Sequence, residues 1–305
     1  MSPLRTLGLW LRLIRPHVLL GGALLYGLGA AIAHYLLRPF DPAPYWLGQA
    51  LVTSIQLAAL LLHEHREAEA DSADRTQAPF DGDRRDLRPD GPPRRAAFYG
   101  SIVCLALATS LATAGLVQQV IPPAGWALLV LGLMAGVFYS QPPLRLVDSG
   151  YGELVASIVV AGLVPSFAFS LQTGELHGLL FTVSLPLVSL HFAMLLVFTL
   201  AAYPTDLAGG RQTLMVRLGW PAGMRLHDAA VGFAVLALAV GAASGLPWRV
   251  ALGAMIALPL AAAQVVQMRR IRAGRPPHWG SLTAGAMGLF ALSAYLLLAG
   301  FLLFG

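Results

Sequence analysis

The chain contains no lysine, because all 20 of its basic residues are arginine. Charged residues make up only 11% of its 305 positions, compared with roughly 25% in soluble domains. It has a single cysteine, Cys104, which excludes an internal disulfide framework. This scarcity of charge, together with 57% hydrophobic residues, excludes a soluble globular protein.

Long uncharged stretches dominate the rest of the sequence. A bilayer core needs about 20 apolar residues for each helix that crosses it. The longest stretch supplies two such helices, because Pro122 and Pro123 interrupt it. We therefore predict an all-α polytopic membrane protein, one domain over residues 1–305, with nine transmembrane spans at 17–37, 44–63, 96–117, 124–141, 151–171, 178–201, 227–245, 248–268 and 281–303.

The arginines predict the orientation of these spans. Cytoplasmic segments of membrane proteins carry an excess of basic residues. With the N-terminus in the cytoplasm, 18 of the 20 arginines fall on the inner side, in segments 1–16, 64–95, 142–150, 202–226 and 269–280. This topology accounts for the net charge of +5, so we expect no nucleic-acid partner.

Acidic residues gather on the same predicted side. Only Asp41 and Glu175 lie outside, and the other acids lie on or near the inner face. Two inner loops concentrate the polar residues, 64–95 after the second span and 202–226 after the sixth. Because four helices separate the starts of these loops, a quasi-repeat could bring both over one cavity.

The first loop begins with an acidic series. Glu64, Glu67 and Asp71 have the spacing i, i+3, i+7, which places them on one face if the helix continues. Like charges so placed repel each other unless a cation lies among them. Carboxylate clusters without cysteine favour hard ions such as Mg²⁺. The alternative is a solvated helix end on which Arg66 and Arg75 neutralise the acids.

Histidines and arginines surround this series. A transition-metal site on His63 and His65 is a further option, although alternate residues point to different helix faces. The arginines in both loops either only set the orientation of the spans or also hold a pyrophosphate beside the metal. The segment YSQPPLRL at 139–146 adds a third inner element, whose two prolines end a span and direct Arg145 toward the membrane surface.

Taken in order, these stretches resemble the UbiA superfamily of intramembrane aromatic prenyltransferases, and most closely its 1,4-dihydroxy-2-naphthoate prenyltransferase branch of menaquinone synthesis. The resemblance covers nearly the whole chain. The matching segments are LIRPHVLLGGALLYGLGAA (13–31), the acidic series at 63–71, FDGDRRDLRPDGPPRRAA (80–97), YSQPPLRLVDSGYGELVASIVVAGLVP (139–165) and AAYPTDLAGGRQTLMVRLG (201–219).

The chain also departs from the family motifs. His63 stands where the first motif has asparagine, and Glu64 and Glu67 replace aspartates. In the second motif Asp206 keeps one aspartate, but Ala202 stands at the position of the other, and Arg211 replaces lysine.

The resemblance implies nine helices around a central cavity, in the plasma (inner) membrane and embedded in the lipid bilayer. It implies transfer of a prenyl group from a prenyl pyrophosphate to an aromatic acceptor. Mg²⁺ would be held by the catalytic acids Glu64, Glu67, Asp71 and Asp206. The substrates would be bound by His63, Arg85, Tyr139, Arg145, Arg211 and Arg15.

Two other functions stay open at this point. A catalytically impaired relative could bind a quinone or isoprenoid, or act as a partner subunit, and Ala202 favours this alternative. A transporter would bury ionisable or polar residues in mid-membrane. The candidates for that role are chiefly His191 and Gln56.

Overall fold

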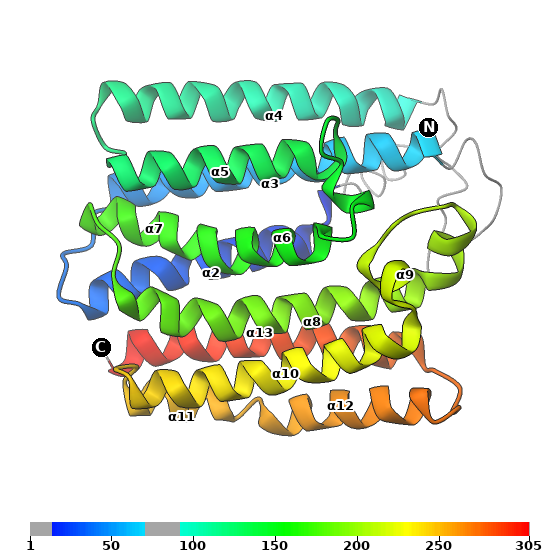
Figure 1. The fold of residues 1–305 in the computed structure, drawn as a ribbon. Helices are drawn as coiled ribbons and strands as arrows, with labels where there is room; N and C mark the ends of the chain where they lie inside the picture. The colour runs from blue at the N-terminus through cyan, green and yellow to red at the C-terminus, as the bar shows by residue number, and fades with distance from the viewer. Residues whose placement is uncertain (1–13, 71–91, 305) are drawn as a thin grey trace, which may run out of the picture.

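The computed structural model describes residues 14–70 and 92–304, which form helices and their connections without a strand. Figure 1 shows the long helices lying side by side, so that the chain runs back and forth along one axis. The helices are α2 (Pro16–Tyr35), α3 (Pro42–Ala70), α4 (Pro92–Val117), α5 (Pro123–Ser140), α6 (Gly152–Ile158), α7 (Val164–Thr173), α8 (Gly178–Ala208), α9 (Leu214–Leu218), α10 (Trp220–Ala243), α11 (Trp248–Met255), α12 (Leu258–Arg272) and α13 (Trp279–Phe304).

Each predicted span coincides with a long apolar helix or helix pair. By length and composition, the described residues contain 8 helices able to cross a membrane, and α11 with α12 forms a further span bent by 42°. The predicted span 151–171 is a composite of α6, a π-helical turn η3 (Val159–Leu163) and α7. The prediction of a polytopic all-α membrane protein with nine spans is therefore confirmed.

Proline residues explain several helix boundaries. α2 and α5 each have proline in their first turn, where the missing N–H costs nothing. α5 ends at Ser140, directly before Gln141, Pro142 and Pro143, as the sequence predicts. α8 continues through Pro186 and Pro204, which neighbouring helices make tolerable in membrane proteins.

The helices pack around two apolar cores. The larger core lies mainly among α2, α8, α10, α11, α12 and α13. The smaller core joins α2, α3, α5 and α7 and includes Tyr26, Leu51 and Phe167. α4 lies at the edge of the bundle beside α3 (Figure 1).

The described parts of the predicted inner segments meet at one end of the bundle, which we call the motif end. There α3, α5, α8 and α12 finish, and α4, α6, α10 and α13 begin (Figure 1). The side of the membrane that the motif end faces stays a prediction. The prediction of one long loop over 202–226 is wrong, because α8 extends to Ala208, and α9 and α10 occupy most of the residues from 214 onward. Only residues 209–213 connect α8 to α9.

Candidate functional site

The last turns of α3 present successive side chains to different neighbours. His63 contacts Tyr139 of α5, with ring centroids 5.8 Å apart, and His65 contacts Phe98 of α4 at 5.0 Å. This divergence results from the helical repeat of about 100° per residue. The two histidines therefore do not form a joint metal site, and no cluster of three or more His, Cys, Asp or Glu able to hold a metal occurs among the described residues.

Glu64 is buried between α3 and the start of α2. Its exposed fraction is 8%, and its carboxylate pairs with the guanidinium of Arg15. Arg15 precedes α2 in the left-handed region, with φ of 46°. A buried carboxylate is costly unless it is paired. The cation that the acidic series needs near Glu64 is thus supplied by an arginine from a different segment.

Arg66 connects α3 to the segment that comes after α5. Its Nη2 lies 2.5 Å from the Oδ2 atom of Asp148, and its Nη1 donates to the carbonyl of Ser140. That carbonyl is one of the unpaired groups at the end of α5. Among the described side chains, Arg66 therefore pairs with Asp148 of a different segment and not with Glu64 of its own helix.

The second acidic position lies at the end of α8. Asp206 is buried, with an exposed fraction of 5%. The Nη1 atom of Arg211 lies 3.8 Å from its Oδ1 atom, and the backbone N–H of Arg211 donates to the carbonyl of Asp206 at 2.9 Å. The connection 209–213 thus folds Arg211 back over Asp206.

Glu153 ties this connection to α6. Its Oε1 atom accepts a hydrogen bond from the N–H of Leu214 at 3.1 Å, and its side chain is buried. Its position in the first turn of α6 also suits a negative charge, because helix N-termini carry partial positive charge. Glu153 therefore fixes the start of α9 directly after Arg211.

A second tie joins the same elements. The Nη1 atom of Arg217 donates to the carbonyl of Ser149 at 2.7 Å, and its guanidinium lies over the ring of Tyr151 at 5.6 Å. Gly150 between them has φ of 74°, and a Cβ added there would approach the Cδ of Arg217 to 2.3 Å. Only glycine allows this close approach.

Replacing Glu153 with alanine should loosen the connection that carries Arg211. The N–H of Leu214 would lose its acceptor in a partly buried setting, where the loss costs up to about 1–3 kcal/mol. We expect a lower free energy of unfolding in detergent and faster tryptic cleavage after Arg211. Glu153→Gln keeps a carbonyl acceptor and should lose less. Unchanged stability and cleavage in Glu153→Ala would show that the hydrogen bond does not hold the connection.

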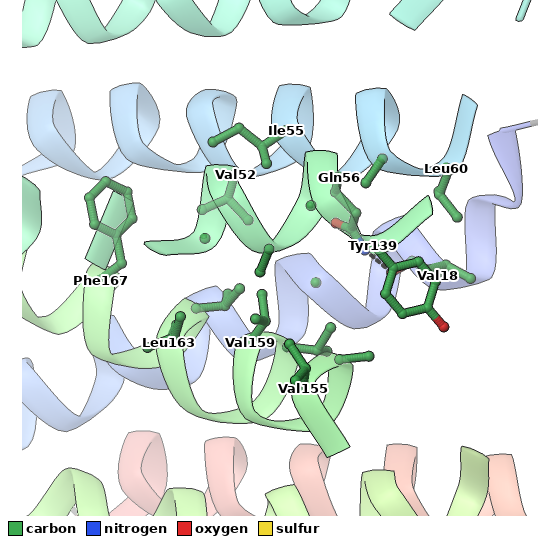
Figure 2. A pocket seen from close by; sticks show the side chains of 18 of the residues that line it. Val18, Val52, Ile55, Gln56, Leu60, Tyr139, Val155, Val159, Leu163 and Phe167 are labelled. Atoms are coloured by element: carbon green, nitrogen blue, oxygen red, sulfur yellow. Dashed lines mark hydrogen bonds between the residues drawn. The ribbon is translucent and has the colours of Figure 1, made fainter. Parts of the chain in front are cut away.

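A cavity of about 220 Å³ lies among α2, α3, α5 and the composite span α6–η3–α7. Its lining is almost entirely apolar, and Figure 2 shows Tyr139 and Phe167 at opposite ends of it, with Val155, Val159 and Leu163 between them. The π-helical turn contributes Val159, Val160 and Leu163 to the wall. Such turns are frequent at functional sites.

Three polar side chains interrupt the apolar lining. His63 and Tyr139 lie at the motif end of the cavity, and Gln56 donates from Nε2 to the carbonyl of Val18 at 2.8 Å. His191, the other mid-span candidate, lies elsewhere, hydrogen-bonded to Ser157 at 3.0 Å and packed on Phe290. The sequence signalled Gln56 only as an amide in mid-membrane. The resemblance implied a central cavity, but the sequence did not show which residues would line it.

The predicted site residues therefore fall into three groups. The structure places His63 with Tyr139, Glu64 with Arg15, and Asp206 with Arg211 at the motif end. Arg145 is exposed on the connection after α5. Glu67 belongs to the last turns of α3, and Asp71 and Arg85 lie outside the described residues.

Comparisons with known proteins identify the fold. No protein-family model matches the chain. The chain is 28% identical over 155 residues to the 1,4-dihydroxy-2-naphthoate octaprenyltransferase of Bacillus subtilis, in an alignment covering 48% of this chain and 49% of that protein. The chain thus matches about half the length of this relative.

Solved structures match over nearly the whole length. A UbiA homologue from Archaeoglobus fulgidus bound to GPP and Mg²⁺ has a TM-score of 0.66 at 16% identity, and covers 97% of this chain and 98% of its own. A UbiA homologue from Aeropyrum pernix has a TM-score of 0.62 at 17% identity, covering 92% and 97%. The resemblance seen in the sequence motifs is therefore confirmed by the fold.

Proposed function

We propose that this protein, which has the fold of the UbiA superfamily, is an intramembrane prenyltransferase that transfers a prenyl group from a prenyl pyrophosphate to an aromatic acceptor. The observation that carries the proposal is that the apolar cavity lies directly beside the charged residues of the motif end. The apolar cavity reaches His63 on α3, and the next residue is the buried Glu64 at the charged motif end. A prenyl pyrophosphate has the matching shape, an apolar tail with an anionic head.

The arginines at the motif end would bind the anionic head. Arg211 lies beside Asp206 and Arg15 beside Glu64. Guanidinium groups bind phosphate oxygens through paired hydrogen bonds. Arg145, on an exposed connection, and Arg85 would complete the set. The apolar lining between Tyr139 and Phe167 would receive the tail.

The donors at the motif end fit Mg²⁺ in their chemistry. Mg²⁺ prefers oxygen ligands and is usually bound by one or two carboxylates together with substrate phosphates. Asp206 and Glu64 are buried carboxylates at one end of the bundle, and Glu67 and Asp71 would complete the set. The bound ion would neutralise charge on the pyrophosphate. Glu64 would contribute less charge to the ion than an unpaired carboxylate, because it already pairs with Arg15.

The residues of the chain would guide each step of the reaction. The allylic C–O bond breaks, and its electron pair leaves with the pyrophosphate, whose charge Arg15 and Arg211 stabilise. A ring carbon of the acceptor then bonds to the allylic carbon and loses its proton, which the released pyrophosphate can accept. The rings of Tyr139 and His63 line the cavity where the allylic carbon would lie. An aromatic face stabilises a cation, and the apolar wall keeps water away from it.

The half-length similarity to a menaquinone-pathway enzyme supports a dihydroxynaphthoate acceptor and a quinone-biosynthetic role in the plasma (inner) membrane. A second candidate, a non-catalytic relative that binds a quinone or isoprenoid or serves as a partner subunit, is favoured by one observation. Ala202 lies one helical turn before Asp206 on the same face of α8, where a carboxylate would complete the pair.

The two functions differ in turnover. Purified protein given Mg²⁺, a prenyl pyrophosphate and 1,4-dihydroxy-2-naphthoate should release pyrophosphate and form a prenylated product detectable by mass spectrometry. Chelation of Mg²⁺ should stop both. Binding of the prenyl pyrophosphate without release of pyrophosphate would support the non-catalytic relative. Absence of Mg²⁺-dependent binding would reject the proposed enzyme.

A further inference from the structure

The apolar cavity has a defined length, and Phe167 lies at one of its ends. It extends from His63 to Val52 on α3 and from Tyr139 to Leu128 on α5. Each stretch rises about 16 Å at the helical repeat of roughly 1.5 Å per residue. The antiparallel span from Val155 to Phe167 gives a similar length. The lengths of cavity wall that α3, α5 and the composite span α6–η3–α7 supply are therefore similar.

Phe167 lies at the end of the cavity away from the motif end. Its exposed fraction is 3%, and it belongs to the smaller apolar core with Tyr26, Leu51 and Leu171. Tyr26 of this core packs edge to face on Tyr45, with ring centroids 5.2 Å apart. Figure 2 shows the ring of Phe167 at the end of the cavity opposite Tyr139. An apolar chain that enters from the motif end would meet this ring after crossing the cavity.

The length of the cavity matches a definite number of isoprene units. An extended unit contributes four chain bonds of about 1.5 Å each and advances roughly 5 Å along its axis. About three units therefore cover the distance from Tyr139 to Phe167.

We propose that Phe167 sets the prenyl chain length that this protein accepts, with a cavity that holds about three isoprene units. The inference rests on the proposed function, because it concerns the tail of the same prenyl pyrophosphate. A two-unit tail leaves apolar wall uncovered, and a fourth unit has no room beyond the ring of Phe167. Each buried CH₂ group strengthens binding, so affinity should rise up to three units and gain nothing from a fourth.

The chain offers matched variants that lengthen and shorten the cavity. Phe167→Ala removes the ring at that end. Gly132 lines the cavity on α5, and a Cβ added there meets no atom within 4 Å, so Gly132→Leu should fill it without a clash. Gly132 precedes Tyr139 by about 10 Å of helix, which leaves room for two units. Phe169→Ala is the control, because Phe169 is equally buried on α7 but packs in the larger core.

The test is calorimetric binding, with Mg²⁺ in lipid nanodiscs, of prenyl pyrophosphates with two, three, four and five units. Dividing the Kd of each variant by that of the parent protein for the same tail cancels partition into lipid. Phe167→Ala should bind the four-unit tail about tenfold more tightly and leave the two-unit tail unchanged. Gly132→Leu should weaken the three-unit tail about tenfold and spare the two-unit tail. Phe169→Ala should shift all tails equally or not at all.

The outcomes separate the two proposals. If no prenyl pyrophosphate binds to the parent protein, the proposed function fails. If all of them bind, but the Kd ratios of Phe167→Ala and Gly132→Leu do not depend on tail length, the assignment of Phe167 is overturned while the proposed function stands. Because Gly132→Leu adds volume instead of removing it, it tests the inference even if Phe167→Ala does not fold.

Discussion

Asp206→Asn is expected to reduce prenyl transfer by about 100-fold or more, the usual effect of removing one group that stabilises charge in a transition state. Asp206 is the aspartate that the second motif retains, and its carboxylate is buried beside Arg211. Asparagine keeps its shape but removes the negative charge that a magnesium ion would need. The measurement is kcat/KM for prenyl transfer, together with the Mg²⁺ concentration that gives half-maximal rate.

The control for this variant is Glu175→Gln, which makes the same change from acid to amide at the opposite end of the bundle. Glu175 is exposed and pairs only with Arg38 in the described part of the chain, at 2.8 Å. Exposed ion pairs contribute roughly 0–1 kcal/mol, so its activity should match that of the parent protein. Equal activity of Asp206→Asn and the parent protein at all Mg²⁺ concentrations would remove Asp206 from the site.

Much of the fold could be predicted from the sequence because bilayer thickness fixes the length of a span. Uncharged stretches of about 20 residues located the helices, and Pro122, Pro123, Pro142 and Pro143 marked the boundaries of α5. The connection after α8 could not be predicted in the same way. Leu214–Leu218 and the first turns of α10 are helical at the motif end, where charge interrupts the apolar pattern without ending the helix.

The candidate site was only partly predictable for a different reason. Spacing predicted that Glu64 shares a helix face with Glu67 and Asp71, but it could not show that Arg15, 49 residues earlier, pairs with Glu64. Glu153 was visible only as an acid at the start of a span, and its bond to Leu214 joins residues 61 positions apart. The cavity between Tyr139 and Phe167 arises where four spans meet. The residue pattern of a single helix does not predict a cavity that forms between several helices.

The pairing of Glu64 with Arg15 bears on how the site tolerates its altered motifs. A guanidinium that neutralises one buried acid leaves fewer free carboxylates to hold a cation. In the proposed site the first motif would also supply Glu67 and Asp71, whereas the second would supply only Asp206, which has Arg211 close by. We therefore expect the second motif to limit affinity for Mg²⁺. This expectation makes position 202 the most informative place to add charge.

Ala202→Asp is expected to raise Mg²⁺ affinity and prenyl transfer by about 10- to 100-fold, the range over which residues that support a metal ligand act. Position 202 lies one turn before Asp206 on α8 and is half-buried, so a new carboxylate would stack beside the existing one. Like charges at this spacing repel, and a bound cation relieves the repulsion. The variant should therefore be less stable than the parent protein without Mg²⁺ and should regain stability when the ion is added.

Two controls isolate the cause of this gain. Ala202→Asn adds the same shape without the charge and should leave the rate near that of the parent protein. Ala208→Asp adds the same charge at the exposed end of α8 on a different face and should have little effect on the rate. If Ala202→Asp gains no more than these two variants, Asp206 does not share its ion with position 202. The absence of an aspartate at position 202 would then be no reason for weak catalysis, and the case for a non-catalytic relative would lose the residue on which it depends.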